Sequence, residues 1–450
     1  TDEQGKPVVR CMVKGAPDVV IGRSNSVLLP DGEVKPLGDK GHQVALDENQ
    51  RIGEEGERAM AVARRDFDPE TFDPNADLLE ISKDLTLLGI VGIVDPPRAE
   101  AKDAITKCHS AGIQVRMITG DHAVTAAAIG KQLGIEGTAL TGAQFAAKSD
   151  DEATKEMPDI AIVARVTPQD KIRMVTLLQR LENIVSMTGD GVNDAPALKK
   201  ADIGVAMGIT GTEVSKGAAV MILTDDNFAT IIKAIEYGRG IYHNLFNFVR
   251  YQMYQLVAFI LSYLLAAFFL VLGGVPFSAA LVLFVNFLVT VPVALTLGFD
   301  KPPPGLMENK PRPLKQPILN SSQWVRVIFL GLLTAIVTVG LESFYQDTDT
   351  ALAATMGYVA FGLMSIAIGV SARNETASSF NRNIISSRNQ LLLYGIALLF
   401  VFLPTEMAFL QSFLGTTSLT GEQWLLAIVA AILLLLVDEV IKFFLRRSRS

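Results

Sequence analysis

The sequence has little of what marks secreted or nucleic-acid-binding proteins. It holds two cysteines, Cys11 and Cys108, in 450 residues, which is too few for a disulfide framework and fits a reducing cytoplasm. The formal net charge is −7, so no nucleic-acid partner is expected. The N-terminus is polar and charged, unlike a signal peptide. Because the chain begins with Thr1 rather than Met, we expect it to be part of a longer protein.

Apolar residues are unevenly distributed along the chain. Residues 1–240 have the pattern of a soluble region, whereas 250–445 hold most of the long apolar runs. In residues 1–86 we expect two strands, Val8–Val13 and Asp18–Ile21, and a charged helix, Leu46–Glu57. The length suffices for two or three domains.

Strand-like and helix-like segments alternate between residues 87 and 228. The expected strands are Leu87–Val94, Gln114–Ile118, Ile160–Val163, Ile184–Met187 and Ile203–Met207. The expected helices are Ala99–Ser110, His122–Leu133 and Pro168–Leu181. This alternation predicts a parallel α/β sheet.

One stretch places paired carboxylates directly after an expected strand. Gly189-Asp190-Gly191-Val192-Asn193-Asp194 follows Ile184–Met187. Ligands of parallel sheets bind at the carboxyl ends of the strands. Glycines let the backbone approach a phosphate, and paired aspartates can hold Mg²⁺ against it. Taken alone, Gly-Asp-Gly is equally consistent with an ordinary acidic turn.

The whole stretch from Ile184 to Leu223 resembles the hinge signature of P-type ion-pumping ATPases, whose phosphorylation domain has the haloacid-dehalogenase-like fold. The resemblance implies that Asp190 coordinates Mg²⁺, while Asn193 and Asp194 position the phosphoryl site. Asp95-Pro96-Pro97-Arg98 matches the hinge motif of the same family. Val220, within the stretch from Ile184 to Leu223, departs from the family pattern, because the family usually has an aspartate at this position.

Two further strand-end features complete the expected catalytic set. In Thr119-Gly120-Asp121, the resemblance implies that Thr119 contacts the transferred phosphoryl group, although the tripeptide can also cap the next helix. Lys171 lies at the start of a helix, where the dipole disfavours a cation, so it needs a nearby anion. The family's nucleophilic aspartate belongs to an Asp-Lys-Thr-Gly-Thr motif, which does not occur between Thr1 and Ser450. We therefore expect this chain alone to form no aspartyl-phosphate.

The resemblance also implies a nucleotide site. Lys14-Gly15-Ala16-Pro17 is similar to a motif whose lysine reaches into the ATP pocket, although the same residues can form a surface turn. Arg58 opens a strand similar to one whose arginine contacts ATP phosphates, a task that suits the guanidinium fork. The implied nucleotide-binding residues are Lys14, Gly15, Arg58 and Arg165, and the implied cofactors are ATP and Mg²⁺.

Six apolar runs approach or exceed the roughly 20 residues needed to cross a bilayer. These runs are Leu256–Leu272, Leu281–Phe299, Val325–Phe344, Ala351–Val370, Leu391–Phe413 and Trp424–Leu445. Before them, Phe228–Phe248 is expected to be an amphipathic stalk helix. Lys and Arg gather in the loops after the second, fourth and sixth runs, so the positive-inside rule places both chain ends and the ATP site in the cytoplasm. We expect an integral protein of the plasma membrane.

The loop Asp300–Pro317 and the segment Asp438–Phe443 resemble the calcium-pump-like subgroup, but the matched ion ligands differ. The matched positions hold Leu256, Phe259, Asn286, Thr290 and Gly362, of which Asn286 is the one unchanged ligand. None is a carboxylate, and divalent ions need several hard oxygens. Glu406, in the fifth run, is a membrane carboxylate outside this set. Neutral oxygens for a transported ion are expected from Asn286, Thr290 and Gln255, although such groups can also simply bridge helices.

The combined expectation is the C-terminal half of an ATP-driven cation pump that couples aspartyl-phosphate formation and hydrolysis to transport. Residues 1–86 would be part of an α+β nucleotide-binding domain, and 87–228 a haloacid-dehalogenase-like α/β domain lacking its first strand. Residues 229–450 would form the stalk and six transmembrane helices. The expected partners are the lipid bilayer, a calcium-like or monovalent cation, and the missing N-terminal half. The alternative is a non-transporting regulatory or degenerate membrane protein that keeps the fold.

Overall fold

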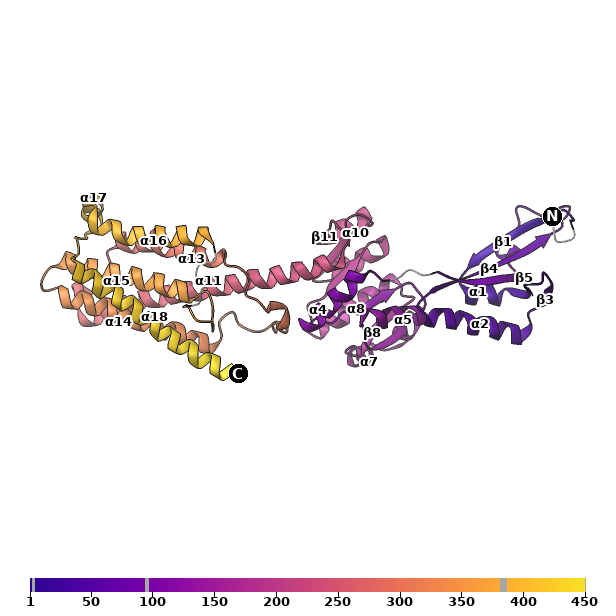
Figure 1. The fold of residues 1–450 in the computed structure, drawn as a ribbon, viewed down its shortest axis with the longest axis horizontal. Coiled ribbons are helices and arrows are strands. Elements are labelled where there is room, and N and C mark those ends of the chain that lie inside the picture. The colour runs from indigo at the N-terminus through magenta and orange to yellow at the C-terminus, as the bar shows by residue number, and fades with distance from the viewer. Residues whose placement is uncertain (2–4, 94–96, 381–386, 450) are drawn as a thin grey trace. The chain divides into compact units, whose positions relative to one another are not determined.

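The structure, a computed structural model, describes residues 1, 5–93, 97–380 and 387–449 (Figure 1). It divides into two compact units. The first comprises Thr1–Lys233 and Met307–Pro311, and the second comprises Ala234–Leu306 and Arg312–Ser450. Helix α11 (Phe228–Phe269) begins in the first unit and continues into the second.

A five-stranded mixed sheet begins the first unit, in the order β1-β4-β5-β2-β3. Its strands are β1 (Val9–Gly15), β2 (Ser24–Leu28), β3 (Val34–Pro36), β4 (Arg58–Phe67) and β5 (Leu85–Ile93). Alternate residues of β4 and β5, including Ala61, Ala63, Leu85 and Leu87, are buried against Val20 and Ile21. The helices of this region are α1 (Pro17–Gly22), α2 (Gly38–Glu54) and α3 (Leu78–Ile81).

Two expectations for this region are wrong. Asp18–Ile21 lies in helix α1 rather than in a strand, because Pro17 at the first turn loses no hydrogen bond and its fixed φ suits a helix start. The run from Leu87 is a strand, but it pairs with β4 and β2 in this first sheet and not with the parallel strands that follow. An apolar run indicates a buried strand without telling which sheet it joins.

Parallel strands form two further sheets in the first unit, and every pairing within them is parallel. One has the order β11-β10-β9 and the other β6-β8-β7. Their strands are β6 (Met117–Thr119), β7 (Thr138–Thr141), β8 (Ile160–Ala164), β9 (Ser186–Gly189), β10 (Ile203–Met207) and β11 (Met221–Leu223). The connecting helices are α4 (Ala99–Ser110), α5 (Ala123–Leu133), α6 (Gly142–Ala147), α7 (Asp150–Glu156), α8 (Pro168–Arg180), α9 (Ala195–Lys200) and α10 (Glu213–Ala218). The predicted parallel α/β architecture is confirmed, as two sheets rather than one.

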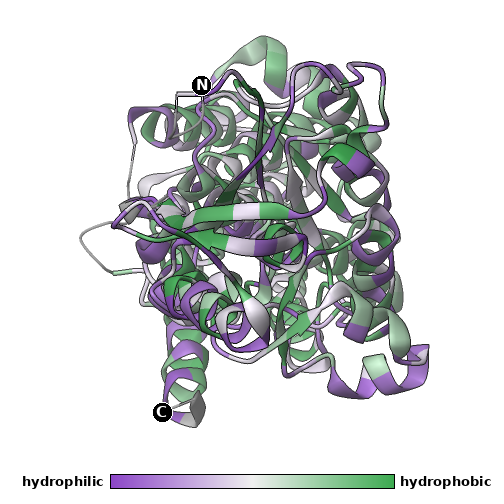
Figure 2. Cartoon of the chain, turned by 90° about the vertical axis from the view of Figure 1, so that its right-hand side faces the viewer, coloured by the Kyte–Doolittle hydropathy of each residue, from purple (hydrophilic) through white to green (hydrophobic). Residues whose placement is uncertain are grey.

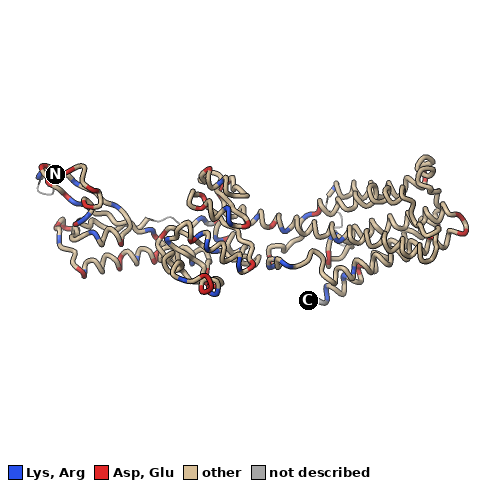
Figure 3. Tube along the Cα trace, turned by 180° about the vertical axis from the view of Figure 1, so that it is seen from behind, with Lys and Arg blue, Asp and Glu red and all other residues tan. Residues whose placement is uncertain are grey.

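Six helices of the described chain are long and apolar enough to cross a membrane, as predicted. They are α11, the continuous run α12–η3–α13 (Ala279–Gly298), α14 (Ser321–Tyr345), α15 (Thr350–Ser371), α16 (Arg388–Glu406) and α18 (Gly421–Arg449). Figure 3 shows charged residues spread over the first unit and sparse along these helices. Figure 2 shows that α18 becomes hydrophilic beside the C-terminus. α15 is the most buried of the six.

Two of the predicted spans contain a proline near an irregularity of the helix. The fifth does not run from Leu391 to Phe413, because α16 ends at Glu406 and a short helix, α17 (Ala408–Leu414), follows. Pro404 lacks the N–H that would bond the carbonyl of Phe400, and the Tyr358 hydroxyl donates to that carbonyl instead. Near the end of α16, Thr416 Oγ1 donates to the carbonyl of Pro404 at 2.6 Å. In the second span, a π-helical segment (Val285–Thr290) precedes Pro292.

Candidate functional site

The carboxyl ends of the parallel strands carry the predicted polar residues. β6 ends at Thr119, and β9 ends at Gly189, immediately before Asp190. Ile118 packs in the apolar clusters of both parallel sheets, one around Met174 and the other around Met187. The two sets of strand ends therefore belong to neighbouring parts of one fold.

Lys171 and Asp194 form an ion pair beneath this edge. Lys171 Nζ lies 2.5 Å from Asp194 Oδ1, and both side chains are largely buried. The second oxygen of Asp194 accepts hydrogen bonds from the backbone N–H groups of Asp190 (3.2 Å) and Gly191 (3.0 Å). Asp194 thus supplies the anion that a lysine in the first turn of α8 needs. Gly189 is required here, because a Cβ atom would lie 2.5 Å from that of Asp194.

Asp190 is exposed, and its carboxylate has no hydrogen-bond partner among the described residues. Its backbone carbonyl is fixed by Thr212 N at 2.8 Å and by Ser215 Oγ at 3.0 Å. A free carboxylate on a fixed backbone suits Mg²⁺, which keeps waters and phosphate oxygens as its other ligands. In the described parts of the chain, no group of three or more His, Cys, Asp or Glu residues gathers to hold a metal ion.

Sequence reasoning missed Asp226, which supports the same loop. Its carboxylate accepts from the N–H groups of Gly208, Ile209 and Thr210 at 2.7–2.9 Å, and from Thr210 Oγ1. These bonds, that from Ile209 first, lower the pKa of Asp226 to about 2. The loop continues to Thr212, which binds the carbonyl of Asp190. The available signal was a carboxylate shortly after strand β11, the same pattern that singled out Asp190.

Arg98, from the expected hinge motif, bonds to Asp226. Its Nη1 donates to the backbone carbonyl of Asp226 at 2.7 Å. Asp95 and Pro96 of the same motif lie outside the described residues. Nothing in the structure explains Val220, which is 76% exposed just before β11.

Thr119 and Asp121 are hydrogen-bonded to each other in a separate turn. Thr119 Oγ1 donates to Asp121 Oδ2 at 2.8 Å and accepts from Asp121 N at 3.1 Å. The side chain that caps α5 is His122, so this tripeptide is not the helix cap. Gly120 and Asn193 are exposed. The structure therefore joins Lys171, Asp190 and Asp194, whereas Thr119 lies at the end of β6 without a hydrogen bond to that group among the described residues.

Lys14 and Arg58 lie on one face of the first sheet. Lys14 is directly opposite Val62 of β4, and Arg58 is four residues from Val62 on the same strand, so the three side chains share a face. Ala61 and Ala63 point to the opposite, buried face. Both cationic side chains are exposed, without an ion pair in the described chain, which fits phosphate binding.

Gly15 and Arg165 have different surroundings. Gly15 ends β1. Arg165 follows β8 with a positive φ of 53° and forms an ion pair with Asp18 at 3.3 Å. A shallow hollow of about 650 Å³ near Arg23 and His42 includes none of the predicted nucleotide residues.

Each of the neutral side chains proposed for a transported ion makes a hydrogen bond within the described chain. Asn286 Nδ2 donates to the carbonyl of Val282, and Thr290 Oγ1 donates to that of Asn286, both within their own helix. Gln255 Oε1 accepts from Ser365 Oγ at 3.1 Å. Apart from the bond of Thr290 to the backbone carbonyl of Asn286, no hydrogen bond joins the side chains of Asn286, Thr290 and Gln255 in the described chain.

Phe259, which stands at a position matched to an ion ligand of the calcium-pump-like subgroup, packs against other aromatic rings. Its ring centroid lies 4.3 Å from that of Phe361 and 5.6 Å from that of Phe277. All three side chains are buried. A packed aromatic trio offers a metal ion no oxygen ligand.

Comparison with known proteins identifies the family. A model described as P-type ATPase, cytoplasmic domain N, matches residues 1–100, and one described as cation transporting ATPase, C-terminus, matches residues 274–444. The chain belongs to the P-type cation-transporting ATPases. It is 35% identical to calcium-transporting ATPase 1 of Bacillus cereus over 96% of this chain and 50% of the relative. It is 36% identical to the calcium-transporting ATPase of Bacillus subtilis over 93% of this chain and 47% of that relative. Identity to the cation-transporting ATPase pma1 of Synechocystis is 34%, over 93% and 47%. The chain thus spans about half the length of these P-type ATPases.

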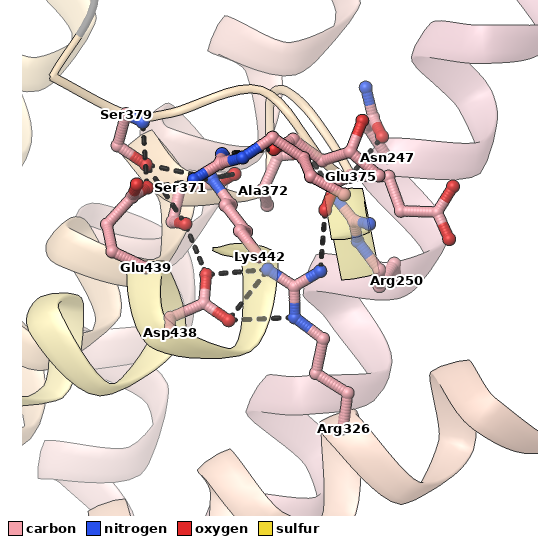
Figure 4. Close-up of polar contacts among 12 residues, drawn as sticks. Asn247, Arg250, Arg326, Ser371, Ala372, Glu375, Ser379, Asp438, Glu439 and Lys442 are labelled. Atoms are coloured by element: carbon pink, nitrogen blue, oxygen red, sulfur yellow. Dashed lines mark hydrogen bonds and ion pairs between the residues drawn. The ribbon is translucent and has the colours of Figure 1, made fainter. Parts of the chain in front are cut away.

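A buried ion-pair network ties three helices of this P-type ATPase chain to the segment after α15 (Figure 4). Arg326 of α14 binds Asp438 of α18 through two bonds of 2.7 Å, and Ser371 Oγ also donates to Asp438. Lys442 Nζ donates to the carbonyl of Ser371 (2.9 Å) and to Ser379 Oγ (2.8 Å). The segment Asp438–Phe443, noted in the sequence for its resemblance alone, therefore holds the segment 371–379.

The stalk-linked helix α11 holds the same segment from another side. Asn247 Nδ2 donates to the carbonyl of Arg373 at 2.8 Å, and Arg250 Nη2 donates to that of Ala372 at 2.6 Å. Arg373 itself pairs with Asp300 through two bonds of 2.7 and 2.6 Å. Arg373, which the sequence offered as a topology signal, is thus also a structural ion-pair partner.

Proposed function

We propose that this chain is the C-terminal half of an ATP-driven cation pump, in which formation and hydrolysis of an aspartyl-phosphate are coupled to transport. The observation that carries the proposal is the network of Lys171, Asp194 and Asp190 at the ends of parallel strands. Lys171, held by Asp194, would stabilise charge on a phosphoryl group, which is the main catalytic need in phosphoryl transfer. Bound Mg²⁺ would neutralise phosphate oxygens beside Asp190.

The haloacid-dehalogenase-like arrangement is part of this proposal. Within the described residues, β9 pairs with β10 alone and β6 with β8 alone, so each strand keeps an open edge. Because Ile118 of β6 packs with Met187 of β9, a further parallel strand between them would complete one sheet. Such a strand would bring the nucleophilic aspartate near Thr119 and Asp190. The doubled length of the relatives supports an origin in the N-terminal half.

Lys14 and Arg58 would bind the phosphates of ATP, and their shared exposed face supports that role. Gly15 would let the backbone approach the nucleotide. Arg165 would have to exchange its ion pair with Asp18 for a phosphate. The gathering of Lys and Arg after alternate spans supports a cytoplasmic location for both chain ends, in a plasma-membrane protein.

Phosphoenzyme formation tests the proposal. The chain alone, incubated with labelled ATP and Mg²⁺, should form no hydroxylamine-sensitive phosphoprotein. Joined to the N-terminal half of the Bacillus subtilis relative, it should form one. Asp190→Asn and Lys171→Ala should each reduce the label by roughly a hundredfold, whereas Asp151→Asn, at an exposed position on α7, should not. Full labelling of the Asp190 and Lys171 variants would exclude this site.

The alternative function is a regulatory membrane protein that keeps the fold without transporting an ion. The aromatic trio of Phe259, Phe277 and Phe361 favours it, because these rings stand near a matched ligand position. Ion uptake by vesicles that contain the joined protein would decide against this alternative.

A further inference from the structure

A fully buried glutamate lies in the second unit without a partner. Glu342, near the end of α14, is 0% exposed, and neither of its carboxylate oxygens has a hydrogen-bond partner among the described residues. Thr338, one turn earlier on the same face, is also 0% exposed, and its Oγ1 is likewise unpartnered. Sequence analysis overlooked Glu342, although it falls inside the third predicted span. Glu406, which was noted, is exposed.

Gly357 of α15 provides the space for this carboxyl group. A Cβ atom at Gly357 would lie 2.6 Å from Cδ of Glu342 and 2.7 Å from its Cγ. The glutamate side chain therefore occupies the room that any other residue at position 357 would fill. Close packing of this kind excludes bulk water from the carboxyl group.

The elements around Glu342 bring no cation to it. α15 contains no Asp, Glu, Lys or Arg. Tyr263 of α11 is a titratable group that interacts electrostatically with Glu342. Its hydroxyl donates to the carbonyl of Phe277. The short segment η2 (Val271–Gly274), which packs on α14, is apolar. Tyr251 of α11 is buried with its hydroxyl unpartnered among the described residues, and it is neutral rather than cationic. Other charged or titratable groups of these elements are bonded elsewhere or exposed: Arg250, Tyr254, Arg326, Asp347, Asp349, Tyr358, Glu422, Asp438, Glu439 and Lys442.

We propose that Glu342 is a proton-binding site of the second unit, packed as a neutral carboxylic acid between α14 and α15. An isolated carboxylate in a low-dielectric interior is so costly that the group binds a proton instead. A metal ion is a poor fit, because the Glu342 carboxyl and the Thr338 hydroxyl are too few oxygens to replace its hydration shell. Release of the proton requires water or a cation to reach the carboxyl group, so it requires α14 and α15 to separate. The proposal does not depend on the phosphoryl-transfer function.

Infrared spectroscopy of the purified chain in lipid nanodiscs tests the proposal. At pH ~7 an ordinary glutamate is ionised, since its pKa is about 4.3 in water. The wild-type chain should nevertheless show the C=O stretch of a protonated acid. Glu342→Gln, which keeps the shape, should abolish this band, whereas Glu406→Gln should leave it intact. Glu342→Asp retains an acid and should shift the band. Absence of the band in the wild type, or a band that responds to neither Glu342 variant, overturns the proposal.

The pH dependence of thermal unfolding provides a second readout. Unfolded Glu342 loses its proton above pH ~4.3, whereas the folded protein keeps it. The wild-type unfolding temperature should therefore fall relative to that of Glu342→Gln as the pH rises from about 5 to about 8. Parallel curves for the two proteins across that range would overturn the proposal.

Discussion

At the scale of single residues, Asp226 fixes the position of a neighbouring carboxylate that is itself left free. Its bonds to Gly208, Ile209 and Thr210 order the loop that leads to Thr212, and Thr212 holds the carbonyl of Asp190. Asp190 can thus stay available for a ligand while its backbone is held in place. The positioning residue and the binding residue are separate, which explains why the sequence motif contains only one of them.

Asp226→Asn should loosen this loop. The amide keeps one acceptor oxygen but loses the charge-assisted bonds, so hydrogen exchange at Gly208 and Ile209 should accelerate by roughly tenfold or more. Because the pKa of Asp226 is lowered to about 2, its contribution to stability is complete above the ordinary aspartate pKa of about 3.9. That contribution is lost as the pH falls toward 2, and the variant should lack this acid dependence. Exchange measured by mass spectrometry, with Asp225→Asn as the control, checks the first part. Unchanged protection would contradict it.

Lys14→Ala should mainly weaken nucleotide binding. The exposed ammonium group has no ion pair to lose in the described chain, so folding should be unaffected. Titration of the chain with a fluorescent ATP analogue should show the loss, and Lys35→Ala, on the exposed strand β3, is the matched control. Equal affinity in both variants would remove Lys14 from the nucleotide site.

At the scale of elements, the segment 371–379 is held by side chains from α11, α14 and α18 (Figure 4). Asp438 is central, because it receives Arg326 and Ser371 together. Its pairing with Arg326 is buried, with side-chain exposures of 8% and 2%. Buried pairs fix geometry more than they add stability, because desolvation of both ions offsets their attraction.

Asp438→Asn should destabilise the second unit by about 3–5 kcal/mol, because it leaves the Arg326 guanidinium buried without its anion. The double variant Arg326→Met with Asp438→Leu removes both charges and should recover most of the loss. Thermal unfolding in detergent, followed by circular dichroism, measures both. If the double variant were as unstable as the single one, the damage would come from packing rather than from the unpaired charge.

Periodicity predicted most elements but not their partners. The strand from Leu85 was visible as an apolar run, yet its pairing with β4 depends on long-range packing that no local pattern contains. Asp18–Ile21 was misjudged because Pro17 as a helix start was overlooked. Pro404 was present in the sequence, but the rescue of its carbonyl by Thr416 was not foreseeable.

Some residues of the candidate sites could likewise be predicted from the sequence, and others could not. Asp190 and Asp194 were recognisable because they follow an expected strand, and Lys171 because a cation at a helix start needs an anion, while their roles came from the family resemblance. Asp226 and Glu342 were not, since a support role and a missing partner are properties of the folded chain. For Gln255, Asn286 and Thr290, residue type suggested a shared site, whereas Asn286 and Thr290 bond to backbone carbonyls of their own helix and Gln255 bonds to Ser365.

At the scale of the whole molecule, the matched ligand positions carry no anionic oxygen, which would limit the transport that we propose. Leu256, Phe259 and Gly362 occupy matched ligand positions without an oxygen-bearing side chain. We expect the joined protein to move at most one cation per ATP. Asn286→Ala with Thr290→Ala should abolish ion-stimulated phosphorylation and leave nucleotide binding intact, whereas Ser262→Ala, another hydroxyl bonded within its own helix, should not. Vesicle assays that gave two Ca²⁺ per ATP would contradict this expectation.

The ion-pair network of α18 also bears on how the protein is made. Helices α11, α14 and α15 leave the ribosome before α18, yet the segment after α15 acquires its anion and its lysine from α18. Until Asp438 and Lys442 are synthesised, Arg326 lacks its buried counter-ion, and the end of α15 lacks the contacts that fix it. The contacts of the segment 371–379 can therefore be completed only after α18 has been synthesised, and an arrest of translation before Asp438 would leave Arg326 and this segment without those partners.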